Sequence, residues 1–311
     1  MFQENVPLAA YSNYKIGGPA RFFILAKTVP DVLLAIEQAK RLGLSIFILG
    51  GGTNLLISDT GFPGVMIKSA FAKLEQTNKT FITAGAGVLV SDLLQFCITN
   101  EFSGLEWAGG LPGTVGGAVW GNAGAFKGEI KDSVKEVVSV DLKNGVFMKR
   151  TNAECQFGYR TSIFKERAQK GEQEVIIEIV FALTKGIRAE IVQVINEKIE
   201  YRKARQPLEY PNIGSIFKNI DIKRVPEETL KKFELKIKTD PFPVLPTAVL
   251  IDAAGLKGKT IGGAMISPKH PNFIVNVKNA SAQDVKTLMT LIQTDLKKQF
   301  GVSLEQEVIF V

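Results

Sequence analysis

Histidine is almost absent from this chain of 311 residues, since His270 is the only one. A hydrolytic serine normally needs a neighbouring histidine as its base. Ser215 lies in the segment GSIFKN at residues 214–219, but Phe217 stands where the nucleophile motif G-x-S-x-G requires its second glycine. If Ser215 takes part in chemistry, we expect it to handle a proton rather than form an acyl-enzyme. The alternative is a glycine turn entering a strand, with a serine that bonds its own backbone.

Cysteine and long apolar runs are also scarce. Cys97 and Cys155 are the only cysteines and form no C-x-x-C pair, so we expect two separate buried thiols. No uninterrupted apolar run approaches the ~18 residues of a membrane span. The opening sequence MFQEN lacks the basic and apolar regions of an export signal. These absences predict a cytoplasmic protein with no membrane partner.

Positive charge exceeds negative charge, which gives a formal net charge of +7. Binding to a nucleic acid would favour a basic stripe with interleaved aromatic residues. The densest basic cluster, residues 202–205, has only Tyr201 beside it, and no RNA-recognition or helix-turn-helix signature is present. We therefore expect no nucleic-acid partner. We interpret the charge as attraction for small anionic ligands such as phosphates and carboxylates.

Hydrophobic periodicity predicts both helices and strands, and hence an α+β fold. The expected helices, with Ser91 as the N-cap of the second, span residues 29–43, 91–100, 188–203 and 281–300. The expected strands span residues 45–49, 65–68, 80–84, 137–142, 146–149, 174–183 and 302–311, and the fourth and fifth of them form a hairpin.

A change in amino-acid composition along the chain predicts two domains. Proline becomes frequent after the helix at residues 188–203, as in a region with a different fold. We place the first domain at residues 1–186, a second and smaller α+β domain at residues 187–301, and a terminal strand at residues 302–311.

Three glycines follow a predicted strand at residues 50–52, where backbone N–H groups can approach a phosphate because no Cβ intervenes. The sequence GGGTNLL over residues 50–56 is not a P-loop, since no Lys-Ser/Thr pair follows. It is not the dinucleotide fingerprint either, since Leu55 stands in place of the third glycine. Taken alone, the loop is equally consistent with phosphate binding and with a tight turn.

A second segment of small residues lies at residues 106–128 and contains LPGTVGGA and GNAG. Pro112 stiffens its approach, and hydroxyl and amide groups are interspersed. Such a bare backbone suits a large planar ligand or a pyrophosphate on main-chain donors. The alternative is close packing of a helix on a sheet. Two such segments without a Rossmann motif suggest a domain that binds a flavin dinucleotide and does not have the Rossmann fold.

With these motifs, the chain resembles the family of UDP-N-acetylenolpyruvoylglucosamine reductases, enzymes of peptidoglycan synthesis. The resemblance extends in order over essentially the whole chain. It is carried by residues 13–20, 50–56, 111–124, 157–165, 214–219, 251–258, 272–276 and 304–308. The short spacing from Tyr201 to Ser215 leaves no room for an additional tyrosine-bearing loop, so the chain is similar to the compact branch of the family.

The resemblance implies an FAD-binding domain of the vanillyl-alcohol-oxidase type followed by a smaller substrate-binding domain. In the family, NADPH reduces FAD, and the reduced flavin delivers hydride to the enolpyruvyl double bond of UDP-N-acetylenolpyruvoylglucosamine. The product is UDP-N-acetylmuramate. The FAD is expected to be non-covalent, because no histidine precedes His270 to tether it in the flavin domain. We expect a monomer.

The resemblance also implies roles for three side chains. Hydride arrival at C3 of the enolpyruvyl group leaves carbanion character at C2 that spreads into the carboxylate. Arg160 matches the cation beside that carboxylate, where its planar fork suits two oxygens. Ser215 matches the proton donor to C2. Glu307 matches the glutamate that assists the enol intermediate, although strand alternation places Glu305 on the same face. Without the resemblance, Arg160 and Glu307 would be read as an ordinary surface arginine and glutamate.

The remaining candidates contact ligands. The expected cofactor contacts are Gly50, Gly51, Gly52, Thr53, Asn54, Leu55, Pro112, Gly113, Thr114, Gly116, Gly117, Asn122, Ala123 and Gly124. The expected substrate contacts are Tyr159, Lys218 and Asn219, with Arg202, Arg205 and Gln206 as weaker candidates. We expect no metal site.

Two other functions compete with this one. The first is a flavin oxidase of the same superfamily that acts on a sugar or an alcohol. The second is a non-catalytic protein that binds a nucleotide sugar. The presence of Arg160, Ser215 and Glu307 together argues against the second.

Overall fold

The computed structural model describes residues 2–240 and 242–311. The chain divides into two compact units. The first contains the N-terminal strand, Ala20–Gly51 and Pro63–Arg202, and the second contains Pro7–Pro19, Gly52–Phe62 and Lys203–Val311. No helix of the described chain is long and apolar enough to cross a membrane.

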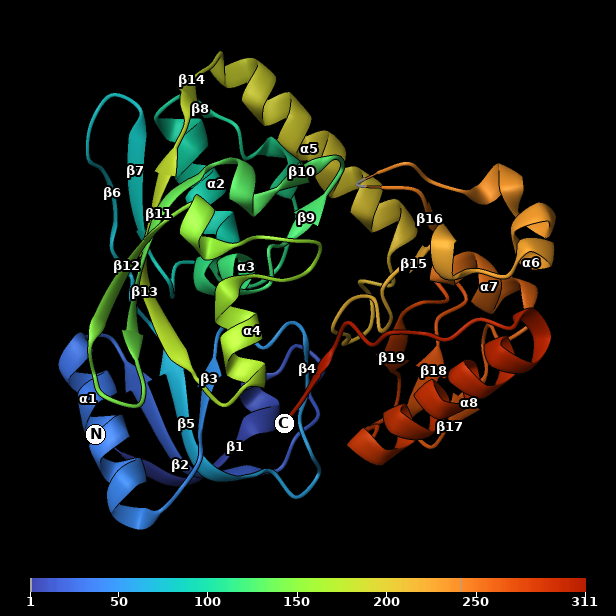
Figure 1. Ribbon diagram of the computed structural model, residues 1–311, viewed down its shortest axis with the longest axis horizontal. Helices are drawn as coiled ribbons and strands as arrows, with labels where there is room; N and C mark the ends of the chain where they lie inside the picture. The colour runs from blue at the N-terminus through green and yellow to red at the C-terminus, as the bar shows by residue number, and fades with distance from the viewer. Residues whose placement is uncertain (1, 241) are drawn as a thin grey trace. The chain divides into compact units, whose positions relative to one another are not determined.

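A four-stranded sheet lies at the start of the first unit (Figure 1). Its order is β1 (Gln3–Pro7), β2 (Pro19–Ala26), β5 (Phe62–Ser69) and β3 (Ile46–Leu49), and β3 and β5 are parallel. Helix α1 (Val29–Leu42) buries its apolar face against β2 and β5, with a Thr28–Asp31 capping box at its start. Gly43 ends the helix with φ of 63°, a conformation that suits glycine.

A five-stranded sheet forms the rest of the first unit. Its order is β12 (Phe147–Thr151), β11 (Val134–Asp141), β13 (Glu174–Ala182), β7 (Phe81–Gly85) and β6 (Leu74–Gln76). Around it lie helices α2 (Val90–Thr99), α3 (Val115–Trp120), α4 (Ile163–Gln169) and α5 (Arg188–Arg205), and the pairs β8 (Phe102–Ser103) with β14 (Thr184–Lys185) and β9 (Gly124–Ala125) with β10 (Gly128–Glu129). Buried side chains of α2, α3 and α5 share one core with β7 and β13.

A buried ion pair joins the strands of this sheet. Arg150 Nη2 on β12 lies 2.8 Å from Glu174 Oε1 on β13, and the Ser139 hydroxyl on β11 also donates to Glu174. Arg167 on α4 reaches Asp141 Oδ2 at 3.3 Å. Because buried charges need partners, this network fixes α4, and the residues that precede α4, on the sheet.

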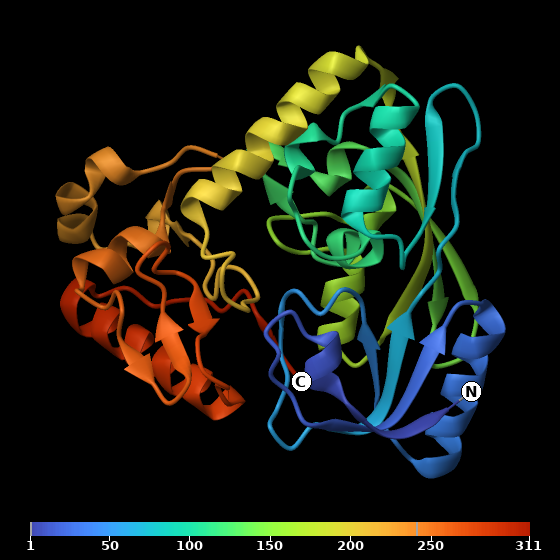
Figure 2. The same ribbon diagram turned by 180° about the vertical axis from the view of Figure 1, so that it is seen from behind.

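The second unit has a three-stranded sheet of β17 (Thr260–Ile261), β18 (Ala264–Ile266) and β19 (Ile274–Asn276), seen from behind in Figure 2. Helix α8 (Ala282–Phe300) packs on β17 and β18. Helices α6 (Glu227–Lys232) and α7 (Thr247–Ala253) and the pair β15 (Ile220–Asp221) with β16 (Val244–Leu245) complete the unit.

Two N-terminal segments belong to the second unit. Strand β4 (Leu55–Leu56) pairs in parallel with β20 (Ile309–Phe310) at the end of the chain. The buried Tyr14 hydroxyl donates to the Ile274 carbonyl at 2.8 Å. Asp59 accepts a hydrogen bond of 2.7 Å from the Ala282 N–H in the first turn of α8. These long-range bonds hold residues from both chain ends in one core.

The predicted helices and most predicted strands are present, with two corrections. Ser91 is not the N-cap of α2: Leu89 is, and the helix start is held by the Val90 N–H, which donates to the Gly113 carbonyl at 3.0 Å. The terminal strand is also much shorter than expected, since only β20 forms. Buried Val302 and Val308 produced an alternating pattern, but the backbone between them pairs only at Gln306.

The compact units do not coincide with the predicted domain spans. Most of α5, which was expected to open the second domain, lies in the first unit, because Ile191 and Ile195 are buried in the core of that unit. Residues 7–19 and 52–62 lie in the second unit.

Candidate functional site

In the first unit, the two glycine-rich segments lie directly against each other. A Cβ on Gly51 would be 2.6 Å from the Gly113 Cα, and a Cβ on Gly50 would be 2.9 Å from the Thr114 hydroxyl. Gly116 packs in the same way on Ala86, at 2.6 Å from its Cβ. A side chain at Gly51 or Gly116 would force the backbones apart, whereas one at Gly50 would displace the Thr114 side chain.

Backbone donors at this contact are available to a ligand. Within the described residues, nothing accepts a hydrogen bond from the N–H groups of Gly51, Gly113 and Thr114. By contrast, the Gly116 N–H donates to the Ala86 carbonyl and the Ala123 N–H to the Ala118 carbonyl. Buried or partly buried N–H groups normally have partners. The available groups therefore fit the phosphate oxygens of a dinucleotide, and the occupied ones have a packing role.

Arg160 lies in a tight turn that is held on the second glycine-rich segment. The Asn122 side-chain amide donates to the Gly158 carbonyl at 2.8 Å, and Arg160 Nη2 donates to the Gly124 carbonyl at 2.8 Å. Arg160 has φ of 56°, in the left-handed region that non-glycine residues seldom adopt. Such strain is maintained only when surrounding contacts enforce it, and it often marks functional positions.

A second arginine accompanies Arg160. Arg202 on α5 is buried, and its Nε donates to the Gly109 carbonyl at 2.8 Å. Its Nη2 is buried with no hydrogen-bond partner in the described chain. Burial, followed by the charge of Arg160, lowers the pKa of Arg202. A buried cation with an unused donor and a like-charged neighbour indicates a place for an anion. The Tyr159 ring centroid lies 5.4 Å from the Arg160 guanidinium carbon.

In the second unit, the first glycine-rich loop continues into a segment held by the chain end. Gly52 has φ of 65°, and a Cβ there would be 2.0 Å from the Tyr11 carbonyl oxygen. The Asn54 side chain donates to the Glu307 carbonyl at 3.1 Å. Leu55 is a buried residue of β4. No described residue accepts from the Gly52, Thr53 or Asn54 N–H groups.

Ser215 and Glu307 lie on two segments that pair with each other. The Glu307 N–H donates to the Ile216 carbonyl at 2.9 Å, and the Lys218 N–H donates to the Glu305 carbonyl at 2.9 Å. Asn272 bonds both backbone groups of Phe217, at 3.1 and 2.8 Å. The Ser215 hydroxyl makes no hydrogen bond within the described chain, so the alternative in which it bonds its own backbone is wrong. Gly214, with φ of 84°, supplies the turn before it.

The structure separates Glu305 from Glu307. The Glu305 carboxylate pairs with the Lys218 ammonium and, at 3.4 Å, with Arg224. The hydrogen bond from Lys218 is the main cause that lowers the pKa of Glu305. Lys218 therefore already has a carboxylate partner, while Asn219 accepts a bond from the Thr247 N–H at 3.3 Å. This ion pair fastens the Ser215 segment to the chain end.

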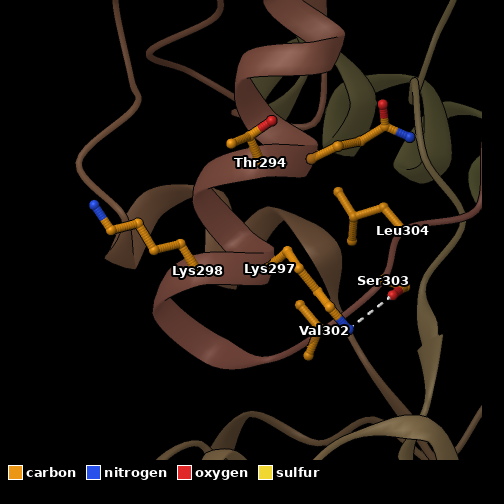
Figure 3. Close-up of a pocket in the computed structure, with 7 residues that line it drawn as sticks. Thr294, Lys297, Lys298, Val302, Ser303 and Leu304 are labelled. Atoms are coloured by element: carbon orange, nitrogen blue, oxygen red, sulfur yellow. Dashed lines mark hydrogen bonds between the residues drawn. The ribbon is translucent and has the colours of Figure 1, made fainter.

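A shallow pocket lies elsewhere in the second unit, at the end of α8 (Figure 3). It is lined by Gln293, Thr294, Lys297, Lys298, Val302, Ser303 and Leu304, and the Lys297 ammonium lies 3.3 Å from the Ser303 hydroxyl. None of the residues that the sequence predicts for the site lines it.

Two family models match the chain. Residues 20–149 match the model described as FAD binding domain. Residues 206–311 match the model described as UDP-N-acetylenolpyruvoylglucosamine reductase, C-terminal domain. The first match includes both glycine-rich segments, and the second includes Ser215 and Glu307.

Full-length relatives carry the same name. The chain is 40% identical to the UDP-N-acetylenolpyruvoylglucosamine reductase of Carboxydothermus hydrogenoformans, over 98% of this chain and 92% of that one. It is 35% identical to the reductase of Lachnoclostridium phytofermentans, over 98% and 91%. The crystal structure of the Thermus caldophilus reductase superposes with a TM-score of 0.78 at 30% identity and covers 100% of this chain and 99% of that one.

His270 is partly buried, and its ring centroid lies 4.7 Å from that of Phe273. Its Nδ1 has no hydrogen-bond partner within the described residues. Burial, with a smaller contribution from the charge of Lys238, lowers the pKa of His270 to about 4. The folded protein therefore holds this imidazole neutral at pH values where the unfolded chain binds a proton.

This difference predicts a pH dependence of stability. Between pH 6.5 and about 4 the unfolded state binds more protons at His270, so the free energy of unfolding should fall as the pH falls through this window. Urea denaturation across the window should show a steeper fall for the wild type than for His270→Asn. Because no other histidine exists, equal slopes for the two proteins would contradict the assignment.

Proposed function

The chain belongs to the UDP-N-acetylenolpyruvoylglucosamine reductase family, and from this membership we propose that it reduces the enolpyruvyl group of UDP-N-acetylenolpyruvoylglucosamine to give UDP-N-acetylmuramate. FAD is the cofactor, NADPH is the reductant, and the product serves peptidoglycan synthesis. The observation that carries the proposal is the pairing of the Ser215 segment with the Glu307 segment in a chain that also has an FAD-binding domain.

The cofactor is proposed to lie on the glycine-rich segments. The N–H groups of Gly51, Gly113 and Thr114 are the donors for its diphosphate, because nothing within the described chain uses them. Bound FAD supplies the transfer of hydride from NADPH to the substrate. The glycine-rich segments would bind the diphosphate of the cofactor, and its flavin ring would face the substrate.

Arg160 is proposed to bind the substrate carboxylate. Its turn holds the guanidinium in place before the substrate arrives, so little reorganisation is needed when negative charge develops. Arg202 adds a second positive charge to the same region of the first unit and draws anionic substrate groups to it. Tyr159 is a substrate contact beside Arg160.

Ser215 is proposed to deliver the proton that completes the reduction. Hydride adds to C3, and the electron pair left at C2 takes the Ser215 hydroxyl proton, so that two hydrogens are added across the double bond. A serine hydroxyl suffices because the carbanion is strongly basic. Glu307, held at a fixed register beside Ser215, stabilises the enol form of the intermediate. Asn219 and Lys218 follow Ser215 and contact the substrate, although the pair with Glu305 restricts Lys218.

We propose further that the enzyme works as a cytoplasmic monomer. One chain carries every residue named above, and its two cysteines are free thiols that are both buried, as suits a reducing compartment. The N-terminal matched region binds FAD, and the C-terminal matched region binds the sugar nucleotide.

Ser215→Ala should separate the two half-reactions. Reduction of the flavin by NADPH should stay within about threefold of wild type, whereas reoxidation by UDP-N-acetylenolpyruvoylglucosamine should slow by about 10²–10⁴-fold, the usual effect of a lost proton donor. Anaerobic stopped-flow measurement of flavin absorbance follows each step. Equal losses in both steps would contradict the proton-donor role.

The wild-type protein in the same experiment tests the proposed function itself. Rapid reoxidation of the reduced flavin by UDP-N-acetylenolpyruvoylglucosamine supports the reductase. Reoxidation by oxygen alone would indicate an oxidase instead.

Alanine at Glu307 and at Glu305 gives a matched pair of variants. We expect Glu307→Ala to lower kcat by about 100-fold or more. Glu305→Ala should cost less than about fivefold, because the Glu305 carboxylate is half-exposed and the backbone bonds from the Glu307 and Lys218 N–H groups still hold the two segments together. Steady-state kinetics on both variants make the comparison, and the opposite ranking would refute the assignment of Glu307.

A further inference from the structure

Lys68 lies beside the first glycine-rich loop and belongs to no motif of the family resemblance. It is the second-last residue of β5 and stands opposite Leu49 in the neighbouring parallel strand β3. Gly50 follows Leu49 directly, so both strands end at the same edge of the sheet. Ligands of open parallel sheets bind at the carboxyl ends of the strands, which is where Lys68 lies.

The Lys68 ammonium holds one peptide of the loop. Its Nζ donates to the Gly50 carbonyl at 2.6 Å, a short hydrogen bond from a charged donor. In a trans peptide the carbonyl and the following N–H point in opposite directions. The bond therefore turns the Gly51 N–H away from Lys68, and this N–H has no acceptor within the described chain.

The other side of the same residue is also constrained. A Cβ on Gly51 would lie 2.6 Å from the Gly113 Cα, so the backbone of the second glycine-rich segment limits its movement. Lys68 and Gly113 thus fix the Gly51 N–H from two sides. Lys68 is partly buried and its ammonium has further hydrogens that no described residue accepts, which leaves positive charge at this edge of the sheet.

We propose that Lys68 is a cofactor-positioning residue: its ammonium orients the Gly50–Gly51 peptide so that the Gly51 N–H meets the FAD diphosphate, and its charge offsets that of the phosphates. This inference rests on the proposed function, since it requires an FAD cofactor. Lys68 would then be a side chain that supports the diphosphate site, for which the sequence motifs predict backbone donors alone. Because Lys68 is partly buried, water screens its charge less. Its ammonium can therefore stabilise both the loop that it bonds and a nearby anion.

The experiment measures FAD binding to the full-length chain after removal of flavin, by the change in flavin fluorescence. We expect Lys68→Met to raise the Kd for FAD by about 10–100-fold, the range for loss of a hydrogen bond from a charged group. Lys68→Arg keeps the charge and a donor, and it should recover most of the affinity. Lys73→Met is the matched control, because Lys73 is half-exposed and pairs with Glu75 and Glu178, so its Kd should match wild type.

The salt dependence of the Kd distinguishes a role toward the cofactor from a purely structural role. Binding should weaken with added salt in wild type and in Lys68→Arg, and less steeply in Lys68→Met, because a positive charge close to the loop that binds the phosphates has been removed. A Lys68→Met protein that binds FAD within about threefold of wild type, or with the wild-type salt dependence, would overturn the inference. Failure of the wild-type chain to bind FAD would instead overturn the proposed function.

Discussion

The close contact of Gly51 with Gly113 constrains how the two glycine-rich segments of the first unit pack, and the proposed cofactor site follows from it. The two backbones approach this closely because Gly51 carries no side chain, since a Cβ there would lie 2.6 Å from the Gly113 Cα. The contact brings segments that are far apart in sequence to one edge of the sheet. It also leaves backbone N–H groups that no described residue accepts, which is the property that a diphosphate requires. Packing and ligand binding therefore impose the same residue type at these positions.

The two units supply different functional groups to the proposed reaction. The first unit supplies backbone donors and the arginines Arg160 and Arg202, which suit the anionic parts of cofactor and substrate. The second supplies a serine hydroxyl with no protein partner in the described chain, on a segment paired with the chain end. The missing histidine is consistent with this arrangement. A hydroxyl that protonates a carbanion needs no neighbouring base, whereas one that attacks a carbonyl does.

Helix bounds depend on residues that are close in sequence, so they could be predicted from the sequence. Hydrophobic periodicity predicted the bounds of α1 and α8 to within one residue. Residues 52–62 were predicted to lie in the first domain, but they lie in the second unit. Their place depends on the pairing of β4 with β20, which no local sequence pattern reveals. Alternation could not choose between Glu305 and Glu307, and the ion pair of Glu305 with Lys218 is a contact between distant segments. The proposed roles of Lys68 and of Arg202, whose Nη2 has no partner within the described residues, rest on contacts between distant segments that no local pattern reveals.

The hydrogen at C2 of the product shows whether an exchangeable donor such as Ser215 completes the reduction. The Ser215 hydroxyl exchanges its proton with solvent, whereas C3 receives hydride. Turnover by the wild-type enzyme in D₂O, followed by NMR of the UDP-N-acetylmuramate, should therefore show deuterium at C2 of the lactyl group. A product with ordinary hydrogen at C2 would contradict the account, because the proton at that carbon would not have come from an exchangeable donor such as Ser215.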